Sequence, residues 1–324
     1  MHNHYSHAFI ISYFPNITTK NINPSFLEFC MDKEILESYR KAGKITSQVR
    51  EFGKELIKPG VKVIDVLDKI EEKIKSLGGG IGFPAQISLN EIAAHFCPEE
   101  EDEITFQKGD VAKLDIGVHI NGYVGDSAVT IDLGNNKDLC NASKEALKAA
   151  IEITKTGIEL GKIGKIIGET IRNHGFEPVK NLSGHGVDHY SVHCSPQIPN
   201  FDTGDKTTLE KDQFIAIEPF ASTGAGMIHE QGKATVFMLS GKRPVRSLIT
   251  RQVMKTILQY DGLPFTTRWL TREFGVPKVN FALRELENIG ILRSFPPLPD
   301  KNDGIVSQHE HTIRVDDEAE ILTK

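Results

Sequence analysis

The chain has 324 residues, of which 39% are hydrophobic and 25% are charged, and its formal net charge is −6. This length can bury one large core or two, and no lysine or arginine block suggests a general nucleic-acid or membrane surface. The four cysteines, Cys30, Cys97, Cys140 and Cys194, form no CxxC pair, which argues against a zinc knuckle and a disulfide framework. This scattered cysteine pattern makes the reducing cytoplasm the expected location. No apolar run approaches the roughly 18 residues of a membrane span.

The N-terminal segment 1–30 contains Asn, Thr and Pro without clear periodicity, and a strong helical pattern begins after Met31. We therefore expect residues 1–30 to be a disordered extension or a leader outside the fold. No basic region precedes the short apolar patch HAFIISYF, which argues against a signal peptide. Amphipathic helices are predicted over 32–57, ended by Pro-Gly, and over 63–77, ended by three glycines.

The next segments read as strands: AQISLN, DVAKLDIGVHI and YVGDSAVTIDL. Helices are predicted over 142–158 and 162–174, followed by strands and loops around NLSGHGVDHYSVH and QFIAIEPF. This order repeats the first half, and KGDVAKLD (108–115) is echoed by KDQFIAIE (211–218), each ending in an acid. Self-similarity at this scale indicates two related α/β halves that face each other, with a site between them.

Residues 241–295 break the repeat and read as three short helices, which we interpret as an inserted helical subdomain. Their basic and aromatic character would also suit a winged-helix nucleic-acid reader. Acids are mixed in and no basic stripe is present, which favours a packing insert. The main domain would then comprise 31–240 and 296–324, and would include a hairpin-like stretch at GIVSQHEHTIRV.

Two aspartates bracket an Asn-Gly pair in LDIGVHINGYVGD, residues 114–126. Asn-Gly between apolar runs predicts a two-residue hairpin loop, which would pair Ile120 with Tyr123 and Gly117 with Asp126. Asp115 and Asp126 would then be diagonal neighbours on one face. Two bare carboxylates in an interior repel each other unless a proton or a cation intervenes. A solvated hairpin with two surface acids is the alternative.

Three further residues complete a candidate ligand set. His185, in SGHG, and Glu218, at the end of FIAIE, are the second-half counterparts of the aspartates, and Glu310 comes from the last strand. His309 and His311 flank Glu310 and would point to the opposite face. Four carboxylates and one imidazole suit two divalent ions, with harder ions such as Mn²⁺, Fe²⁺ or Co²⁺ favoured. The residues alone predict a dinuclear metal hydrolase.

The segments DIGVHINGYVGD, NLSGHGVDHYSVH, IAIEPFASTGAG and QHEHTI resemble the signature segments of type II methionine aminopeptidases. The lack of a long charged N-terminal domain resembles the archaeal branch. The resemblance runs from about Met31 to the C-terminus and includes the insert. It implies the pita-bread fold, with pseudo-two-fold halves around a dinuclear centre. It also implies removal of the initiator methionine from nascent proteins whose second residue is small, by attack of a metal-activated water or hydroxide on the first peptide bond.

The resemblance assigns roles to the five candidate ligands. Asp115 would hold one metal ion, and His185 and Glu218 would hold the other. Asp126 and Glu310 would bridge the two ions. Glu218 would also transfer the proton of the attacking water. The ions themselves (Co, Mn, Fe, Zn or Ni) are not determined by the sequence.

The resemblance also points to a substrate pocket. His95, in NEIAAH, and His193 would contact the substrate near the scissile bond, and Phe83 would line the methionine pocket. Plain core roles are the alternatives for His95 and Phe83. The partner would be the N-terminus of a nascent chain, bound by a cytoplasmic monomer, with ribosome docking left open and no membrane or specific nucleic acid expected. An X-Pro aminopeptidase or prolidase on the same fold, and a non-enzymatic nucleic-acid- or partner-binding relative, are the rival functions.

Overall fold

A computed structural model describes the backbone of residues 24–324 and the side chains from residue 33 onward. Residues 38–324 form one compact unit, and the packing below is that of this unit. The extension expected over 1–30 lies mostly outside the described residues, and only 24–30, in the first helix, lie within them. That helix, α2 (Pro24–Leu56), begins before the predicted residue 32. Among the described residues, no helix has the length and apolar character that a membrane crossing requires.

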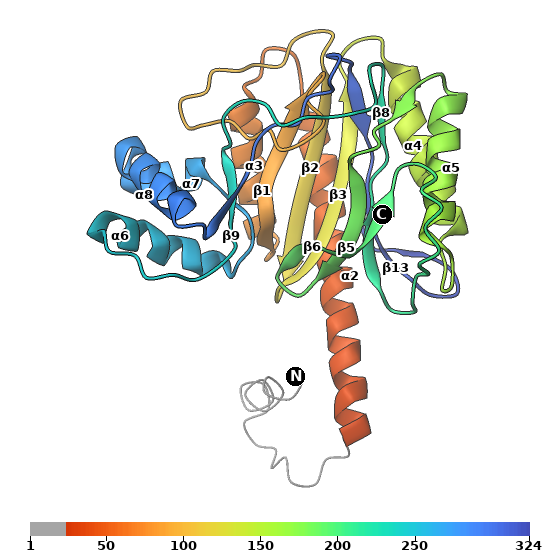
Figure 1. Cartoon of the computed structure of the whole chain (residues 1–324), viewed down its shortest axis with the longest axis horizontal. Helices are drawn as coiled ribbons and strands as arrows, with labels where there is room; N and C mark the ends of the chain where they lie inside the picture. The colour runs from red at the N-terminus through yellow and green to blue at the C-terminus, as the bar shows by residue number, and fades with distance from the viewer. Residues whose placement is uncertain (1–23) are drawn as a thin grey trace. The chain divides into compact units, whose positions relative to one another are not determined.

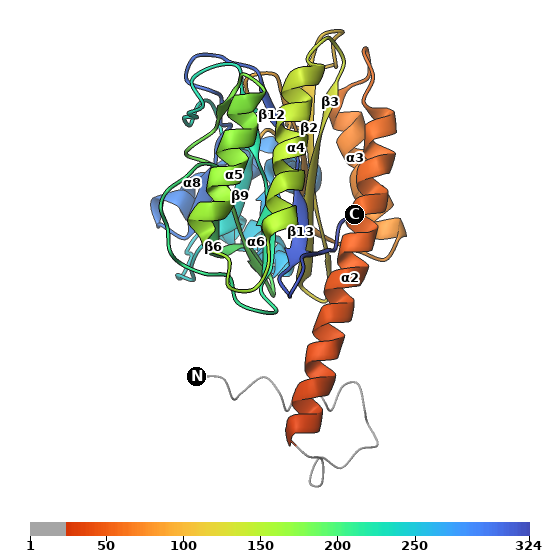
Figure 2. The same ribbon diagram turned by 90° about the vertical axis from the view of Figure 1, so that its right-hand side faces the viewer.

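The first half consists of a three-stranded antiparallel sheet backed by helices (Figure 1; Figure 2). Its elements are α3 (Val63–Ser76), β1 (Gly80–Leu89), β2 (Val111–Ile120) and β3 (Tyr123–Asp132). Val63, Leu67, Ile70 and Ile74 recur at helical spacing on α3 and are fully buried against the sheet. Gly78 follows with a φ of 78°, which ends the helix where the sequence predicted.

The second half repeats this order of two helices followed by strands. Two helices, α4 (Lys137–Ile153) and α5 (Leu160–Asn173), cover the two sheets of this half. One sheet has the order β14-β13-β7-β5-β6 and another the order β12-β8-β4. Their strands are β4 (Glu177–Pro178), β5 (Ser183–Asp188), β6 (Ser191–Pro199), β7 (Phe214–Ile217), β8 (Phe220–Ser222), β12 (Val306–Gln308), β13 (His311–Arg314) and β14 (Glu320–Ile321). The two halves have separate hydrophobic cores, in agreement with the predicted repeat.

The segment predicted to be an insert has its own core and contains strands as well as helices. Its helices are α6 (Leu248–Ile257), α7 (Thr267–Phe274) and α8 (Val276–Asn288). A small sheet joins β10 (Phe265–Thr266) and β11 (Leu292–Phe295) to β9 (Val236–Leu239), which precedes residue 241. The fully buried Arg268 of α7 donates to Glu71 of α3 at 2.8 Å, and this ion pair attaches the segment to the first half.

The predicted hairpin near the C-terminus is wrong. β12 pairs with β8, whereas β13 pairs with β7 and β14, so the two strands belong to different sheets. The chain crosses between these sheets along β3, where the Glu310 amide donates to the Ala128 carbonyl at 3.0 Å and Ser127 Oγ donates to the Glu310 carbonyl at 2.7 Å. Long-range partners thus separate two strands that are adjacent in sequence.

Candidate active site

The two aspartates of the first half lie on the paired strands β2 and β3. Asn121 and Gly122 both have positive φ, 52° and 87°, as a two-residue turn requires. The register pairs Gly117 with Asp126, which confirms the prediction made from the Asn-Gly pair. Asp115 and Asp126 both line one pocket, so this hairpin brings two carboxylates to an interior site rather than to the surface.

The imidazole of the second half is held on β5 by close backbone packing. His185 pairs in register with Ala216 of β7. A Cβ on Gly184 would lie 2.3 Å from the Ala216 carbonyl oxygen, and one on Gly186 would lie 2.3 Å from that of Ser195. Both flanking positions of SGHG therefore require glycine, because only a bare backbone allows His185 to approach the facing strands so closely.

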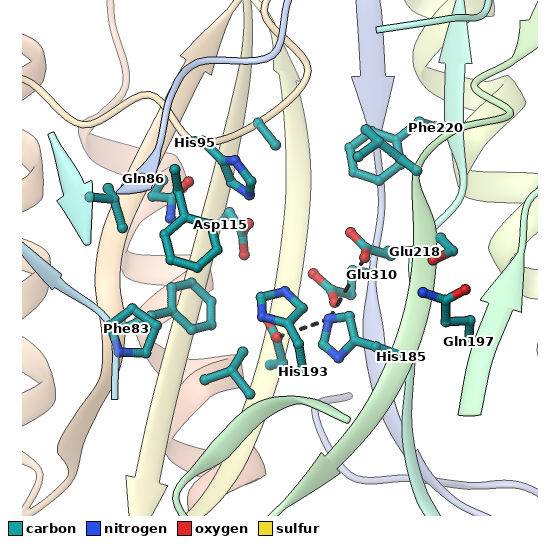
Figure 3. A pocket seen from close by; sticks show the side chains of 18 of the residues that line it. Phe83, Gln86, His95, Asp115, His185, His193, Gln197, Glu218, Phe220 and Glu310 are labelled. Carbon is teal, nitrogen blue, oxygen red and sulfur yellow. Dashed lines mark ion pairs between the residues drawn. The ribbon is translucent and has the colours of Figure 1, made fainter. Parts of the chain in front are cut away.

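The remaining two carboxylates follow the ends of strands. Glu218 comes directly after β7, and Glu310 lies between β12 and β13. The two neighbours of Glu310 point away from the other ligands, as predicted. His309 Nδ1 lies 2.9 Å from Ser143 Oγ, and His311 Nδ1 lies 2.9 Å from Thr323 Oγ1. The structure thus gathers the five candidate ligands from both halves around one pocket, and Figure 3 labels Asp115, His185, Glu218 and Glu310 among them.

Distances within this cluster match a shared ion site. His185 Nε2 lies 3.8 Å from Asp126 Oδ2 and 3.7 Å from Glu218 Oε1. One ligand atom from each of Asp126, His185 and Glu310 lies within 4.8 Å of the others. Figure 3 shows Glu218, Glu310 and His185 directed toward one another from separate segments of the chain.

Burial in this crowded cluster favours the neutral forms of its members. Desolvation raises the pKa of Asp115 to about 7. Desolvation and the charges of neighbouring acids raise the pKa values of Asp126, Glu218 and Glu310 well above their ordinary range. Desolvation lowers the pKa of His185 to about 3, so this imidazole is neutral and able to act as a ligand.

The donor atoms of the site fit divalent cations. Asp115 Oδ1, Asp126 Oδ1 and Glu310 Oε1 are buried and have no hydrogen-bond partner. Buried carboxylate oxygens without donors are costly unless a proton or a cation satisfies them. Four carboxylates and one neutral imidazole form an oxygen-rich set of the kind that binds harder divalent ions.

The pocket beside this cluster has a volume of about 510 Å³ and is lined by His95, His193 and Phe83, the three predicted substrate residues. His95 has a φ of 67°, a strained conformation for a non-glycine residue. Burial first, and then the charge of His193, lowers the pKa of His95 to about 4. The ring of His193 lies 4.3 Å from that of His185. Burial also lowers the pKa of His193 to about 4, so His95 and His193 both line the pocket as neutral imidazoles.

Several residues that line the pocket or contact a lining residue were not predicted from the sequence. Gln308 Nε2 donates to Glu218 Oε2 at 3.2 Å and orients that carboxylate. Gln308 lies two residues before the predicted ligand Glu310, and this position could have marked Gln308 as a site residue. Gln86, Arg293 and Phe295 line the pocket itself, and Figure 3 shows Gln86 beside His95 and Asp115. β11 supplies Arg293 and Phe295, and nothing local in the sequence marks them.

Known proteins with the same sequence pattern and fold identify the family. Metallopeptidase family M24 matches residues 37–253. The methionine aminopeptidase of Archaeoglobus fulgidus is 44% identical over 294 residues, which cover 90% of this chain and 99% of that protein. A crystal structure of methionine aminopeptidase from Thermotoga maritima has a TM-score of 0.66 at 26% identity and covers 94% of this chain and 98% of its own. A thermophilic Arx1 has a TM-score of 0.80 at 16% identity, covers 89% of this chain and 90% of its own, and shows the shared fold alone. The chain belongs to the methionine aminopeptidases of metallopeptidase family M24.

Proposed function

We propose that this protein removes the initiator methionine from nascent proteins whose second residue is small. The observation that carries the proposal is the buried cluster of unpartnered carboxylate oxygens beside a pocket of about 510 Å³. Such a pocket is within the range of about 300–1,000 Å³ that encloses small ligands. The family membership supplies the reaction class, and the cluster supplies the groups that a metal-dependent peptidase needs.

The proposal includes two divalent ions per chain. Asp115 would hold one ion, His185 and Glu218 would hold the other, and Asp126 and Glu310 would bridge them. Four carboxylate charges balance two divalent cations, which removes the repulsion that otherwise raises the pKa values of the cluster. When bound, such ions activate water at neutral pH and stabilise negative charge on the attacked carbonyl group.

The protein's own groups move the proton and orient the substrate. Glu218, a member of the cluster, would accept the proton of the attacking water, and its Oε2 is held by the hydrogen bond from Gln308. We assign to His95 and His193 the binding of the substrate amide around the scissile bond. Neutral imidazoles can donate to the carbonyl oxygen as negative charge develops on it.

Phe83 is the proposed wall of the methionine side-chain site. It is buried and packs with Val124, Val192 and Leu263 in a small apolar cluster. A thioether side chain makes favourable contacts with an aromatic ring. The predicted role of Phe83 in substrate binding therefore has a physical basis, and plain core packing alone does not explain its place in the pocket lining.

We further propose that the protein acts as a monomer in the cytoplasm on chains that emerge from the ribosome. The test uses full-length substrate proteins that begin Met-Ala or Met-Leu, incubated with the Mn²⁺-loaded enzyme and weighed by intact mass spectrometry. Loss of one methionine from the Met-Ala protein alone supports the proposal. Equal trimming of both, or of neither, would reject it.

A further inference from the structure

We propose that Arg293 binds a carboxylate in the downstream part of the substrate, so that the enzyme prefers peptides with an acidic group two or three residues after the cleaved bond. This inference rests on the proposed function and adds a specificity determinant to it. Arg293 is not a candidate metal ligand, and it comes from β11, which belongs to the small sheet of the helical segment rather than to either repeated half.

The position of Arg293 is at the mouth of the pocket. Its side chain lines the pocket, yet the residue is exposed to solvent. Phe295, two residues further along β11, shares its face of the strand and is buried. The Arg293 guanidinium lies 4.9 Å from the centroid of the Phe295 ring, and that ring lies 5.5 Å from the ring of His95. A series of contacts thus leads from the pocket mouth to the proposed reaction site.

The charge of Arg293 acts on the pocket. Arg293 forms no ion pair with any residue in the described part of the chain, and its charge contributes to lowering the pKa values of both His95 and His193. Arg293 is also the one lysine or arginine among the residues that line the pocket. Once two divalent ions neutralise the four carboxylates, its positive charge is the formal charge that remains on the lining.

These features favour a carboxylate as the occupant. A guanidinium whose face lies over an aromatic ring keeps its N–H groups available at its edge, and that planar fork matches a carboxylate. An extended peptide advances about 3.3 Å per residue, so a chain whose first peptide bond lies near His95 reaches the pocket mouth within a few residues. The carboxylate could be an acidic side chain or the C-terminus of a short peptide, and the two sources need separate arms of a test.

The experiment compares kcat and KM for amidated peptides Met-Ala-Glu-Gly, Met-Ala-Gln-Gly and Met-Ala-Lys-Gly, and for Met-Ala-Ser with a free or amidated C-terminus. The enzymes are the wild type, Arg293→Met, Arg293→Glu and the control Arg284→Met, which removes an exposed arginine from α8. We expect the wild type and the control to prefer the Glu peptide over the Gln peptide by about fivefold through KM, the size expected for one partly exposed ion pair. The preference should shrink in high salt.

The variants separate recognition from structural support. Arg293→Met should lose the preference with little change in kcat, and Arg293→Glu should favour the Lys peptide. A free carboxylate effect on Met-Ala-Ser alone would place the recognised group at a chain terminus, whereas an effect on the amidated Glu peptide would place it on a side chain. An unchanged preference in Arg293→Met, or an equal loss of kcat on every peptide, would overturn the inference. Methionine release without any acid preference would overturn this inference alone, and no release from any peptide would overturn the proposed function with it.

Discussion

Replacing Asp115 by asparagine should stabilise the metal-free protein at pH 8, and should stabilise it less at pH 5. The pKa of Asp115 is raised to about 7 by desolvation. A carboxyl group with a raised pKa binds its proton more tightly in the folded state than in the unfolded state. Its contribution to stability is therefore fully present below the ordinary pKa near 4 and is lost as the pH rises through about 7. Asparagine carries no charge and does not suffer this loss.

The size of the effect follows from the shift. A rise from 3.8 to about 7 corresponds to about 4 kcal/mol of folding free energy lost at pH 8, which is an upper value. Removing this charge also relieves Glu218 and Glu310, whose pKa values the charge of Asp115 raises further. For a chain of this length, 4 kcal/mol corresponds to a melting temperature about 8 °C higher in the variant.

The assay is a thermal melt of chelator-treated protein at pH 5 and pH 8, with and without Mn²⁺. Asp303→Asn is the control, because it replaces an exposed aspartate outside the pocket. With Mn²⁺ at pH 8 the order should invert, since the wild type keeps a ligand that the variant lacks. If the metal-free melts of wild type and Asp115→Asn coincide at pH 8, the reasoning about this site is refuted.

Three further substitutions test separate parts of the account. Glu310→Gln should weaken Mn²⁺ binding in an equilibrium dialysis assay, and undiminished binding would exclude Glu310 as a ligand. Gly117→Ala would place a Cβ 2.2 Å from Phe83 Cε1, so the phenyl ring would have to move. This variant should raise the KM for methionine peptides about tenfold or more while Mn²⁺ binding persists. An unchanged KM would remove Phe83 from the methionine site. Arg268→Met should lower the melting temperature by about 6–10 °C, because it leaves the buried Glu71 carboxylate without its guanidinium partner. If the unpaired carboxylate is the cause, the Arg268→Met, Glu71→Gln double variant should recover part of the lost melting temperature.

Local sequence chemistry predicted the parts of the fold that short-range contacts decide. The Asn121-Gly122 turn determines the β2–β3 register, so the diagonal placement of Asp115 and Asp126 could be derived from the sequence. The buried stripe of α3 and its glycine-rich end were predicted for the same reason. Two similar halves were visible because each repeats the same order of helices and strands.

Features that depend on distant partners were missed. β12 and β13 are adjacent in sequence, yet each pairs with a different sheet, and no local pattern near Glu310 distinguishes this crossing from a hairpin. The strands of the helical segment pair with β9, which lies outside the predicted insert. Arg293 and Phe295 reach the pocket through that pairing, so their place in the site could be recognised only in the folded chain.

The measurement that tests the central claim most directly is peptide cleavage by metal-stripped enzyme with Mn²⁺ added back. Met-Ala-Ser and Ala-Pro-Ser are offered side by side, and bound Mn²⁺ is measured on the same sample. The account predicts metal-dependent release of methionine from the first peptide and no cleavage of the second. Cleavage of Ala-Pro-Ser alone, or no cleavage of either peptide while Mn²⁺ is bound, would contradict it.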